Sequence, residues 1–261
     1  MTYRPKIDIN CDMGEAFGAW RLGLTDDELL MPLITSANVA AGFHGGDPNH
    51  LDRSVRLAKA NGVGLGAHPG YADLQGFGRR TLKAPAEELV NDIVYQMGAV
   101  REFGRRHGVP LQHVKLHGAL ALDAGADPVL AEAFAATIEA IEPTLFVMGM
   151  QVWETVKAAQ ARGLPVIREF YADRDYGPDG NIVFARKVDR MDPATVGQKV
   201  LRACREGLVT TVEGEDIEVA FESICFHSDT PGSLEMAKGI RAALAEGGIE
   251  VAPITDVLAT I

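Results

Sequence analysis

The chain has 261 residues, of which 47% are hydrophobic and 23% are charged. This length and composition suit one large α/β domain with a sizeable buried core. The net charge of −11 disfavours nucleic acid and anionic membrane surfaces as partners, because both require a basic face. The three cysteines form no CxxC pair and the N-terminus has no apolar signal core, so we expect a reducing, cytoplasmic location without disulfides or structural zinc.

Short apolar β-type runs alternate along the chain with longer amphipathic runs. The predicted strands are Lys6–Cys11, Ser36–Ala41, Gly62–Ala67, His113–Leu116, Thr144–Met148, Pro165–Phe170 and Ser223–Phe226. Because parallel strands need crossover connections, the alternation predicts a parallel sheet with helices outside it. Seven strands fit a barrel-like closure, complete or incomplete, better than two separate domains. We therefore predict a single α/β domain over residues 1–261.

The helices between these strands begin at recognisable signals. Thr25 and Glu28 form a predicted capping box, and an Asp-Pro pair of N-cap and first helical residue precedes three further helices. The predicted helices are Asp26–Leu33, Asn49–Ala60, Ala86–Arg106, those opened by Asp127-Pro128 and Asp192-Pro193, and one from Asp229-Thr230-Pro231 to about Glu246. Residues 176–221 interrupt the rhythm with two turn signals, around residues 178–180 and 213–216, which predict hairpin excursions.

Polar side chains gather just after the predicted strands. They are Asn10, Asp12 and Glu15, then Asn38, His44 and Asp47, then His68 and Tyr71, then Lys115 and His117, then Glu169, Asp173 and Arg174, and finally His227 and Asp229. The carboxyl ends of parallel strands form the active face of barrels and open α/β sheets. Four of the seven histidines, His44, His68, His117 and His227, are therefore expected to converge on one face.

Several of these residues also have a purely structural interpretation. Asp47 and Asp229 precede proline-containing helix starts and would cap those helices, whereas His44 and His68 would be a core and a turn histidine. Lys115 lies in the apolar strand HVKLHGAL, where an ammonium group is costly to bury without a partner. That cost favours a functional role for Lys115.

Other polar residues have lesser predicted roles. Arg79 and Arg80 are expected in a solvated loop or as a clamp for phosphate or carboxylate. The histidines at positions 50, 107 and 113 are expected on helix or loop surfaces, with no role, and Cys11 and Cys225 are expected in the core.

The predicted polar set is suited to proton transfer. Carboxylates and imidazoles can relay protons near neutral pH, and Lys115 can stabilise an oxyanion or a phosphoryl group. Asp12, His44 and His68 could form an open metal site, but their spacing leaves a metal undetermined. The sequence contains neither a GxxxxGK[ST] loop nor a GxSxG elbow, so a nucleotide would have to bind without a Walker A cradle.

Five blocks of the sequence together resemble the LamB/YcsF lactam-utilisation family. They are IDINCDMGEAFG, TSANVAAGFHGGDP, GAHPGYADLQGFGRR, LQHVKLHGAL and FHSDTPGSLEMA, and the resemblance runs in order from Ile7 to about Ile254. It implies a distorted seven-stranded β/α barrel similar to that of polysaccharide deacetylases. It also implies an ATP-hydrolysing 5-oxoprolinase, which opens 5-oxo-L-proline to L-glutamate and has separate B and C subunits. The substrate of this chain would be 5-oxoproline or a similar small lactam.

The resemblance maps the family's polar positions onto this chain, and Arg79 and Arg174 are added to them from the sequence itself. We predict catalytic roles for Asp12, His44, His68, Lys115, His117, His227 and Asp229, and substrate binding by Glu15, Asn38, Asp47, Arg79 and Arg174. Four positions depart from the family pattern, which commonly has Cys, Pro, Tyr and Gly where this chain has Ala41, Leu116, Ala121 and Ser228. These departures leave the identity of the lactam open. ATP is expected as co-substrate of the complex, with a divalent metal as an option.

An ATP requirement fits the chemistry of a five-membered lactam. Such a ring re-forms easily because its amine and carboxyl group are held together, and phosphorylating the lactam oxygen would make the carbon electrophilic. Two other interpretations stay open at this point. One is a free-standing, metal-dependent deacetylase or amidohydrolase, which metal analysis and ATP dependence would distinguish. The other is a non-catalytic scaffold for partner subunits.

Overall fold

The computed structural model describes residues 5–21, 23–185 and 188–260. The chain divides into two compact units. The first unit consists of Met1–Cys11, Gly23–Ser36 and Glu169–Ile261, and the second of Asp12–Leu22 and Ala37–Arg168. Strands β1 (Lys6–Met13) and β8 (Val166–Tyr171) each begin in one unit and end in the other.

Eight strands form one sheet in the order β11-β8-β7-β6-β5-β4-β1-β12, and β11 also pairs with β1. The remaining strands of this sheet are β4 (Ser36–Ala40), β5 (Gly64–His68), β6 (Leu111–Lys115), β7 (Phe146–Gly149), β11 (Ser223–Phe226) and the short β12 (Glu250–Val251). Strands β5 to β8 pair in parallel, as do β8, β11 and β1. The seven longer strands therefore join in a ring, which confirms the predicted seven-stranded β/α barrel.

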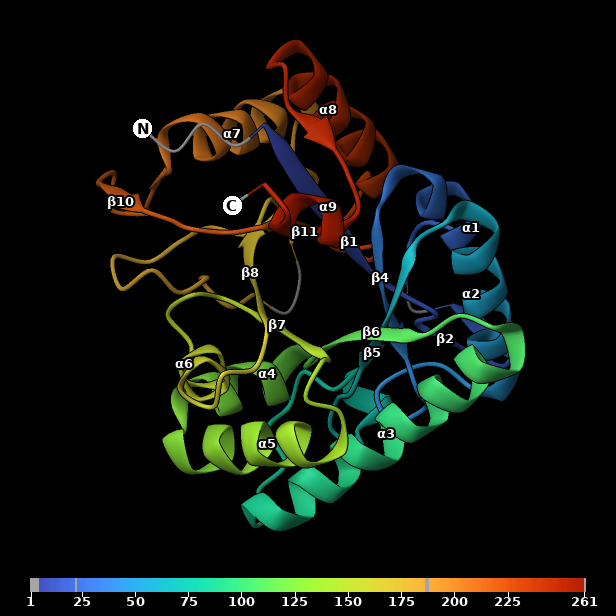
Figure 1. Ribbon diagram of the computed structural model, residues 1–261. Helices are drawn as coiled ribbons and strands as arrows, with labels where there is room; N and C mark the ends of the chain where they lie inside the picture. The colour runs from blue at the N-terminus through green and yellow to red at the C-terminus, as the bar shows by residue number, and fades with distance from the viewer. Residues whose placement is uncertain (1–4, 22, 186–187, 261) are drawn as a thin grey trace. The chain divides into compact units, whose positions relative to one another are not determined.

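Among the described residues, the second unit contains the α-helices α2 (Pro48–Asn61), α3 (Ala86–His107), α4 (Gly118–Ala126), α5 (Pro128–Ile141) and α6 (Glu154–Ala161). Helix α3 buries Leu89, Ile93, Met97 and Val100 at the predicted helical spacing. It packs beside α5, as Figure 1 shows in the green part of the ribbon. The sequence prediction gave no residue range for helices α4 and α6.

The first unit contains α1 (Asp27–Leu30), the 3-10 turn Met31–Leu33, α7 (Pro193–Glu206), α8 (Ser233–Glu246) and α9 (Ile254–Leu258). Helices α7 and α8 approach closely (Figure 1). A Cβ atom at Gly239 would lie only 2.6 Å from the carbonyl oxygen of Pro193, so this crossing depends on glycine.

The predicted hairpin excursions are present in the first unit. Strands β9 (Leu208–Thr210) and β10 (Asp216–Glu218) pair antiparallel around the second turn signal. Tyr176 and Ile182 form an antiparallel bridge around the first one. Residues 186 and 187, within the predicted stretch 176–221, lie outside the described residues.

Several details of the sequence prediction were wrong. The capping box is absent, because Asp26 is the N-cap of α1 and Thr25 hydrogen-bonds instead to Ser233, 2.6 Å away. His113 is fully buried in β6, not on a surface. The hairpin of β2 (Ala16–Phe17) and β3 (Trp20–Arg21), in the second unit, was not predicted.

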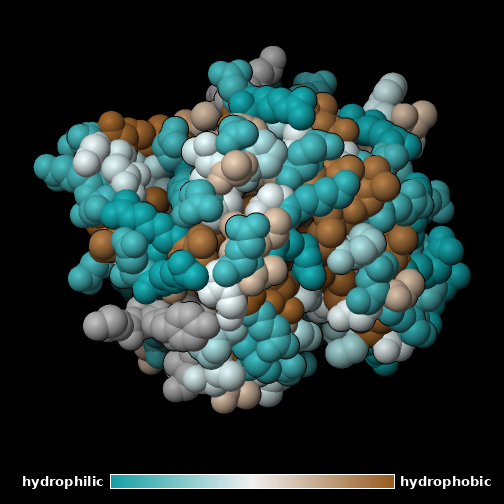
Figure 2. Space-filling model, turned by 90° about the horizontal axis from the view of Figure 1, so that it is seen from above, coloured by the Kyte–Doolittle hydropathy of each residue, from teal (hydrophilic) through white to brown (hydrophobic). Residues whose placement is uncertain are grey.

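The surface is mixed in character. On the face drawn in Figure 2, hydrophilic side chains surround separate apolar areas. Large exposed apolar side chains include Trp20, which is 72% exposed, and Val183, Phe184 and Val212. Within the described residues, no helix is long and apolar enough to cross a membrane.

Candidate functional site

In the second unit, polar side chains converge from the carboxyl ends of four strands, β1, β4, β5 and β6. The residues are Asp12 and Glu15, Asn38 and His44, His68, and Lys115 and His117. All seven are at most 5% exposed. So many buried polar groups are tolerated only when they are paired or hold a ligand. We refer to these seven residues as the polar group of the second unit.

Asp12 is the centre of one half of this group. Its Oδ1 accepts hydrogen bonds from Lys115 Nζ at 3.1 Å and from Asn38 Nδ2 at 2.8 Å. Its Oδ2 lies 3.2 Å from His68 Nε2. Lys115 is therefore buried against a carboxylate, as its cost of desolvation requires.

His113 positions the side chain of Asn38. The sequence prediction missed this role. His113 Nε2 donates to Asn38 Oδ1 at 2.8 Å, which turns the amide nitrogen of Asn38 towards Asp12. Burial, with the nearby charge of Lys115, lowers the pKa of His113 to about 3. A signal was available, because His113 and Lys115 are two residues apart and share one face of their strand.

His68 and His117 form the second half of the group. His68 Nδ1 lies 2.8 Å from the carbonyl oxygen of Lys115, and His117 Nε2 lies 2.8 Å from that of Phe77. A carbonyl oxygen only accepts hydrogen bonds, so these two nitrogens carry the hydrogen atoms. The other nitrogens, His68 Nε2 and His117 Nδ1, lie 3.0 Å apart.

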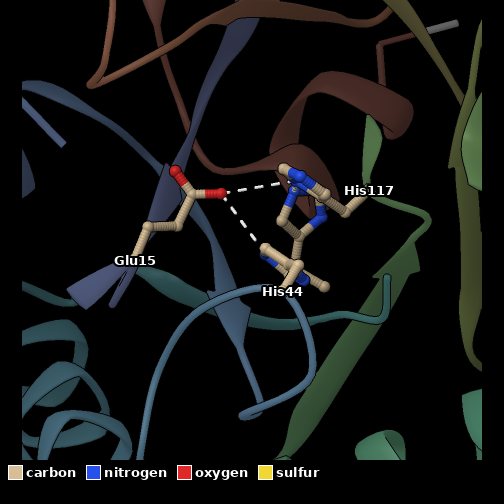
Figure 3. A group of neighbouring side chains, drawn as sticks. Glu15, His44 and His117 are labelled. Carbon is tan, nitrogen blue, oxygen red and sulfur yellow. Dashed lines mark hydrogen bonds and ion pairs between the residues drawn. The ribbon is translucent and has the colours of Figure 1, made fainter. Parts of the chain in front are cut away.

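Glu15 and His44 complete this second half. Glu15 Oε1 lies 3.4 Å from both His44 Nε2 and His117 Nδ1, and Figure 3 shows both imidazoles directed at this oxygen. The rings of His44 and His117 stack with centroids 3.7 Å apart. Neither nitrogen of His44 has a hydrogen-bond partner among the described residues, although the ring is fully buried.

Burial keeps two of these imidazoles neutral. It lowers the pKa of His44 well below the ordinary value, and the neighbouring charges of His68 and Arg79 lower it further. The pKa of His117 is likewise lowered by burial and by His44 and His68, despite the hydrogen bond to Phe77. Neutral imidazoles can act as proton acceptors or as metal ligands.

Two glycines leave room for the imidazole rings. A Cβ atom at Gly70 would lie 2.5 Å from His44 Nδ1, and one at Gly78 would lie 2.7 Å from His44 Cβ and 2.8 Å from His117 Cδ2. The loop at Gly70 is held by Gln96 of α3, which accepts from the backbone N–H of Gly70 and donates to its carbonyl oxygen, each at 3.0 Å. Gln96 was not predicted, although a buried glutamine on the apolar face of α3 is an available signal.

A different polar group lies in the first unit, around Asp173. The carboxylate accepts from the backbone N–H of His227 at 3.1 Å, from His227 Nδ1 at 3.0 Å and from the Thr230 hydroxyl at 2.6 Å. Arg174 Nη1 lies 2.9 Å from the same carboxylate. Burial alone would raise the pKa of Asp173, but His227, Arg174 and the hydrogen bonds hold it well below its usual range.

The remaining predicted site residues have other surroundings. Asp47 accepts from the backbone N–H groups of Asn49, His50 and Gly18, so it caps α2 as its structural interpretation predicts. Asp229 is not a helix cap, because Gly232 is the N-cap of α8. Arg79 lies over the Phe77 ring, with its Cζ 4.9 Å from the ring centroid.

Three of the four histidines expected together, His44, His68 and His117, do converge. Arg174, His227 and Asp229 belong to the first unit, and their approach to the polar group of the second unit stays a prediction.

Four residues of the second unit form a group able to hold a metal ion: Glu15, His44, His68 and His117. One ligand atom from each lies within 4.8 Å of the others. The set differs from the predicted trio of Asp12, His44 and His68. Asp12 Oδ1 accepts from Lys115 and Asn38 while its Oδ2 lies 3.2 Å from His68 Nε2. Glu15, three residues further along, lies beside His44 and His117.

The comparisons with known proteins all point to the same family. The family model described as the LamB/YcsF family matches residues 7–259. A Pseudomonas aeruginosa relative, named as an A subunit of 5-oxoprolinase, is 53% identical over 94% of this chain and 98% of its own length. A Rhodopseudomonas palustris relative with the same designation is 43% identical over 95% of this chain and 98% of its own. The crystal structure of a lactam utilization protein from Thermus thermophilus matches with a TM-score of 0.87 and 39% identity, covering 94% of this chain and 98% of that one.

Proposed function

The chain belongs to the LamB/YcsF family, and on that premise we propose that it is the A subunit of an ATP-dependent 5-oxoprolinase. In this role it takes part in opening 5-oxoproline to glutamate. The observation that carries the proposal is the 53% identity, over nearly the whole of both chains, to a relative named for this activity. The buried polar group of the second unit supports it, since a chemically inert scaffold would not need seven such residues at the strand ends.

The polar group offers what lactam opening demands. Negative charge develops on the lactam oxygen, or on a phosphoryl group attached to it, and the ammonium of Lys115 can stabilise that charge. We assign Asp12, 3.1 Å from Lys115, as the acceptor for the proton of the attacking water. Ring opening then breaks the C–N bond, and the nitrogen leaves as the amine after it takes up the proton that Asp12 accepted from the water.

ATP and the partner subunits belong to the proposal as well. ATP would phosphorylate the lactam oxygen and so link ring opening to its own hydrolysis. The sequence has no Walker A loop, and the names of the relatives designate them as one of several subunits. We therefore propose that B and C subunits are needed for turnover, in the cytoplasm. Arg79, with its guanidinium over Phe77 near His44, is the candidate to bind the substrate carboxylate.

Glutamate release from 5-oxoproline tests the proposal. The purified chain, the B and C subunits, and the three together are each assayed with and without ATP. We expect glutamate only from the three together and only with ATP. Robust ATP-dependent turnover by the chain alone would contradict the need for partners. ATP-independent release of acetate from acetylated amines would favour the metal-dependent deacetylase instead.

A further inference from the structure

We propose that Glu15, His44, His68 and His117 bind one divalent transition-metal ion, with Zn²⁺ as the best match to the ligands. The proposal rests on the geometry of these four buried side chains and not on the proposed reaction. It goes beyond that reaction by adding a metal centre beside the Asp12–Lys115 pair.

Three of the distances between the ligand atoms match those of a metal's coordination shell, and the four atoms all lie within 4.8 Å of one another. Two ligands each 2.0–2.1 Å from zinc at a tetrahedral angle are separated by about 3.3 Å. In the second unit, Glu15 Oε1 lies 3.4 Å from His44 Nε2 and from His117 Nδ1, and His117 Nδ1 lies 3.0 Å from His68 Nε2. Figure 3 shows that three of these side chains come from separate loops and strand ends, so the close approach is not imposed by local sequence.

Backbone carbonyls fix the tautomers that a metal requires. His68 Nδ1 donates to the carbonyl oxygen of Lys115, and His117 Nε2 donates to that of Phe77. Metal-binding histidines characteristically donate their outer N–H to such an acceptor, which orients the ring and makes the inner nitrogen more basic. The inner nitrogens of both residues are consequently lone-pair donors that face each other.

Facing lone pairs need a cation between them. Without one, His68 Nε2 and His117 Nδ1 would repel each other at 3.0 Å, and the buried His44 ring would have no hydrogen bond among the described residues. A metal ion satisfies all three rings at once and also neutralises Glu15.

The ligand set selects the kind of metal. Three imidazoles and one carboxylate suit Zn²⁺ and its neighbours such as Co²⁺, whereas Mg²⁺ and Ca²⁺ prefer oxygen ligands. Zinc can expand from four to five ligands, which leaves a position for a substrate oxygen or water.

Direct metal binding tests the proposal without any turnover. The full chain is stripped with a chelator and titrated with Zn²⁺ by calorimetry, and with Co²⁺ by its visible absorption, which reports imidazole ligation. We expect one ion per chain with a Kd below about 1 μM. His44→Gln and His117→Gln should each weaken binding about a hundredfold or more, whereas His107→Gln, on the outer helix α3, should bind as the wild type does.

Either of two results would overturn the proposal. Wild-type chain that takes up no ion, or His44→Gln and His117→Gln variants that bind Zn²⁺ as tightly as the wild type, would exclude this site. If a histidine variant fails to fold in thermal unfolding, Glu15→Gln replaces it, since it keeps the shape of the side chain and removes its charge. Metal binding without lactam turnover would leave this inference standing and would count against the proposed function alone.

Discussion

The polar groups of the two units solve the burial of charge in opposite ways. In the first unit, Asp173 is surrounded by donors from His227, Thr230 and Arg174, and its pKa is held well below the usual range. In the second unit, the pKa values of His44 and His117 are lowered because burial outweighs the nearby carboxylate of Asp12.

The contrast distinguishes a network that stabilises the fold from one that is suited to binding a ligand. The Asp173 network satisfies its carboxylate entirely from the protein, and such a network mainly fixes local structure. The imidazoles of the second unit instead direct lone pairs at one another and at Glu15. We therefore expect substitutions in the first network to affect folding more than those in the second, and substitutions in the second to affect binding and turnover.

The largest expected effect is on stability, from Asp173→Asn. Removing the charge leaves the buried Arg174 without its carboxylate, and breaking a buried pair in this way costs about 3–5 kcal/mol. Urea unfolding at pH 7 measures the loss. The matched control is Asp179→Asn, at an exposed carboxylate bonded to Asn181, which should change stability by less than about 1 kcal/mol. Equal losses of stability in Asp173→Asn and Asp179→Asn would show that the Asp173 network does not stabilise the protein.

Lys115→Met should affect turnover more than folding. Methionine keeps much of the length of the lysine and drops the charge that faces Asp12. We expect the reconstituted complex to lose about a hundredfold or more in turnover, equivalent to roughly 3 kcal/mol of transition-state stabilisation. Lys59→Met, at a surface lysine that donates to the carbonyl oxygen of His107, is the control. Near-normal turnover of Lys115→Met would reduce Lys115 to a structural ion-pair partner.

The pH dependence of stability offers a finer test of the first network. The folded pKa of Asp173 lies below the ordinary 3.8, so its interactions stabilise the protein fully above that pH and are lost as the pH falls through lower values. The stability difference between wild type and Asp173→Asn should therefore narrow below about pH 4. A difference that stays constant from pH 6 to pH 3 would show that the charge of Asp173 contributes nothing.

The smallest expected effect concerns the cap of α2. Asp47→Ala removes the acceptor for the backbone N–H groups of Asn49 and His50. Loss of such a cap costs about 1 kcal/mol, which urea unfolding can measure, and Asp47→Asn should recover most of it. An unchanged midpoint for Asp47→Ala would show that the cap contributes nothing to stability.

Sequence periodicity was sufficient to predict much of this arrangement. Alternating apolar runs located the strands to within a few residues, and the carboxyl ends of β4, β5 and β6 correctly placed His44, His68 and His117. The sequence showed that Lys115 is costly to bury without a partner, and in the structure Asp12 is that partner. These successes share one cause, because strand direction alone decides which end of a parallel sheet a residue reaches.

Choices between close neighbours in the sequence could not be predicted. Asp12 lies near the end of β1 and Glu15 just after it, and only the turn after β1 decides that Glu15 meets His44 and His117 while Asp12 meets His68. His113 was predicted on a surface although its spacing from Lys115 was an available signal. Its burial also requires Gly66, where a Cβ atom would lie 2.0 Å from the ring. The Thr25 hydroxyl was expected to cap a helix but bonds to Ser233, which is distant in sequence. Such contacts between distant residues have no local signature.

The most direct test of the central claim compares two histidine variants in one assay. The claim is that the polar group of the second unit is where the reaction takes place. ATP-dependent glutamate formation is measured in complexes that contain either the His117→Gln or the His107→Gln chain. His107 lies on α3 and pairs with Asp52, away from the polar group, so that its loss should change the rate by no more than a few-fold. We predict a fall of about a hundredfold or more for His117→Gln, whereas equal rates for the two variants would contradict the account.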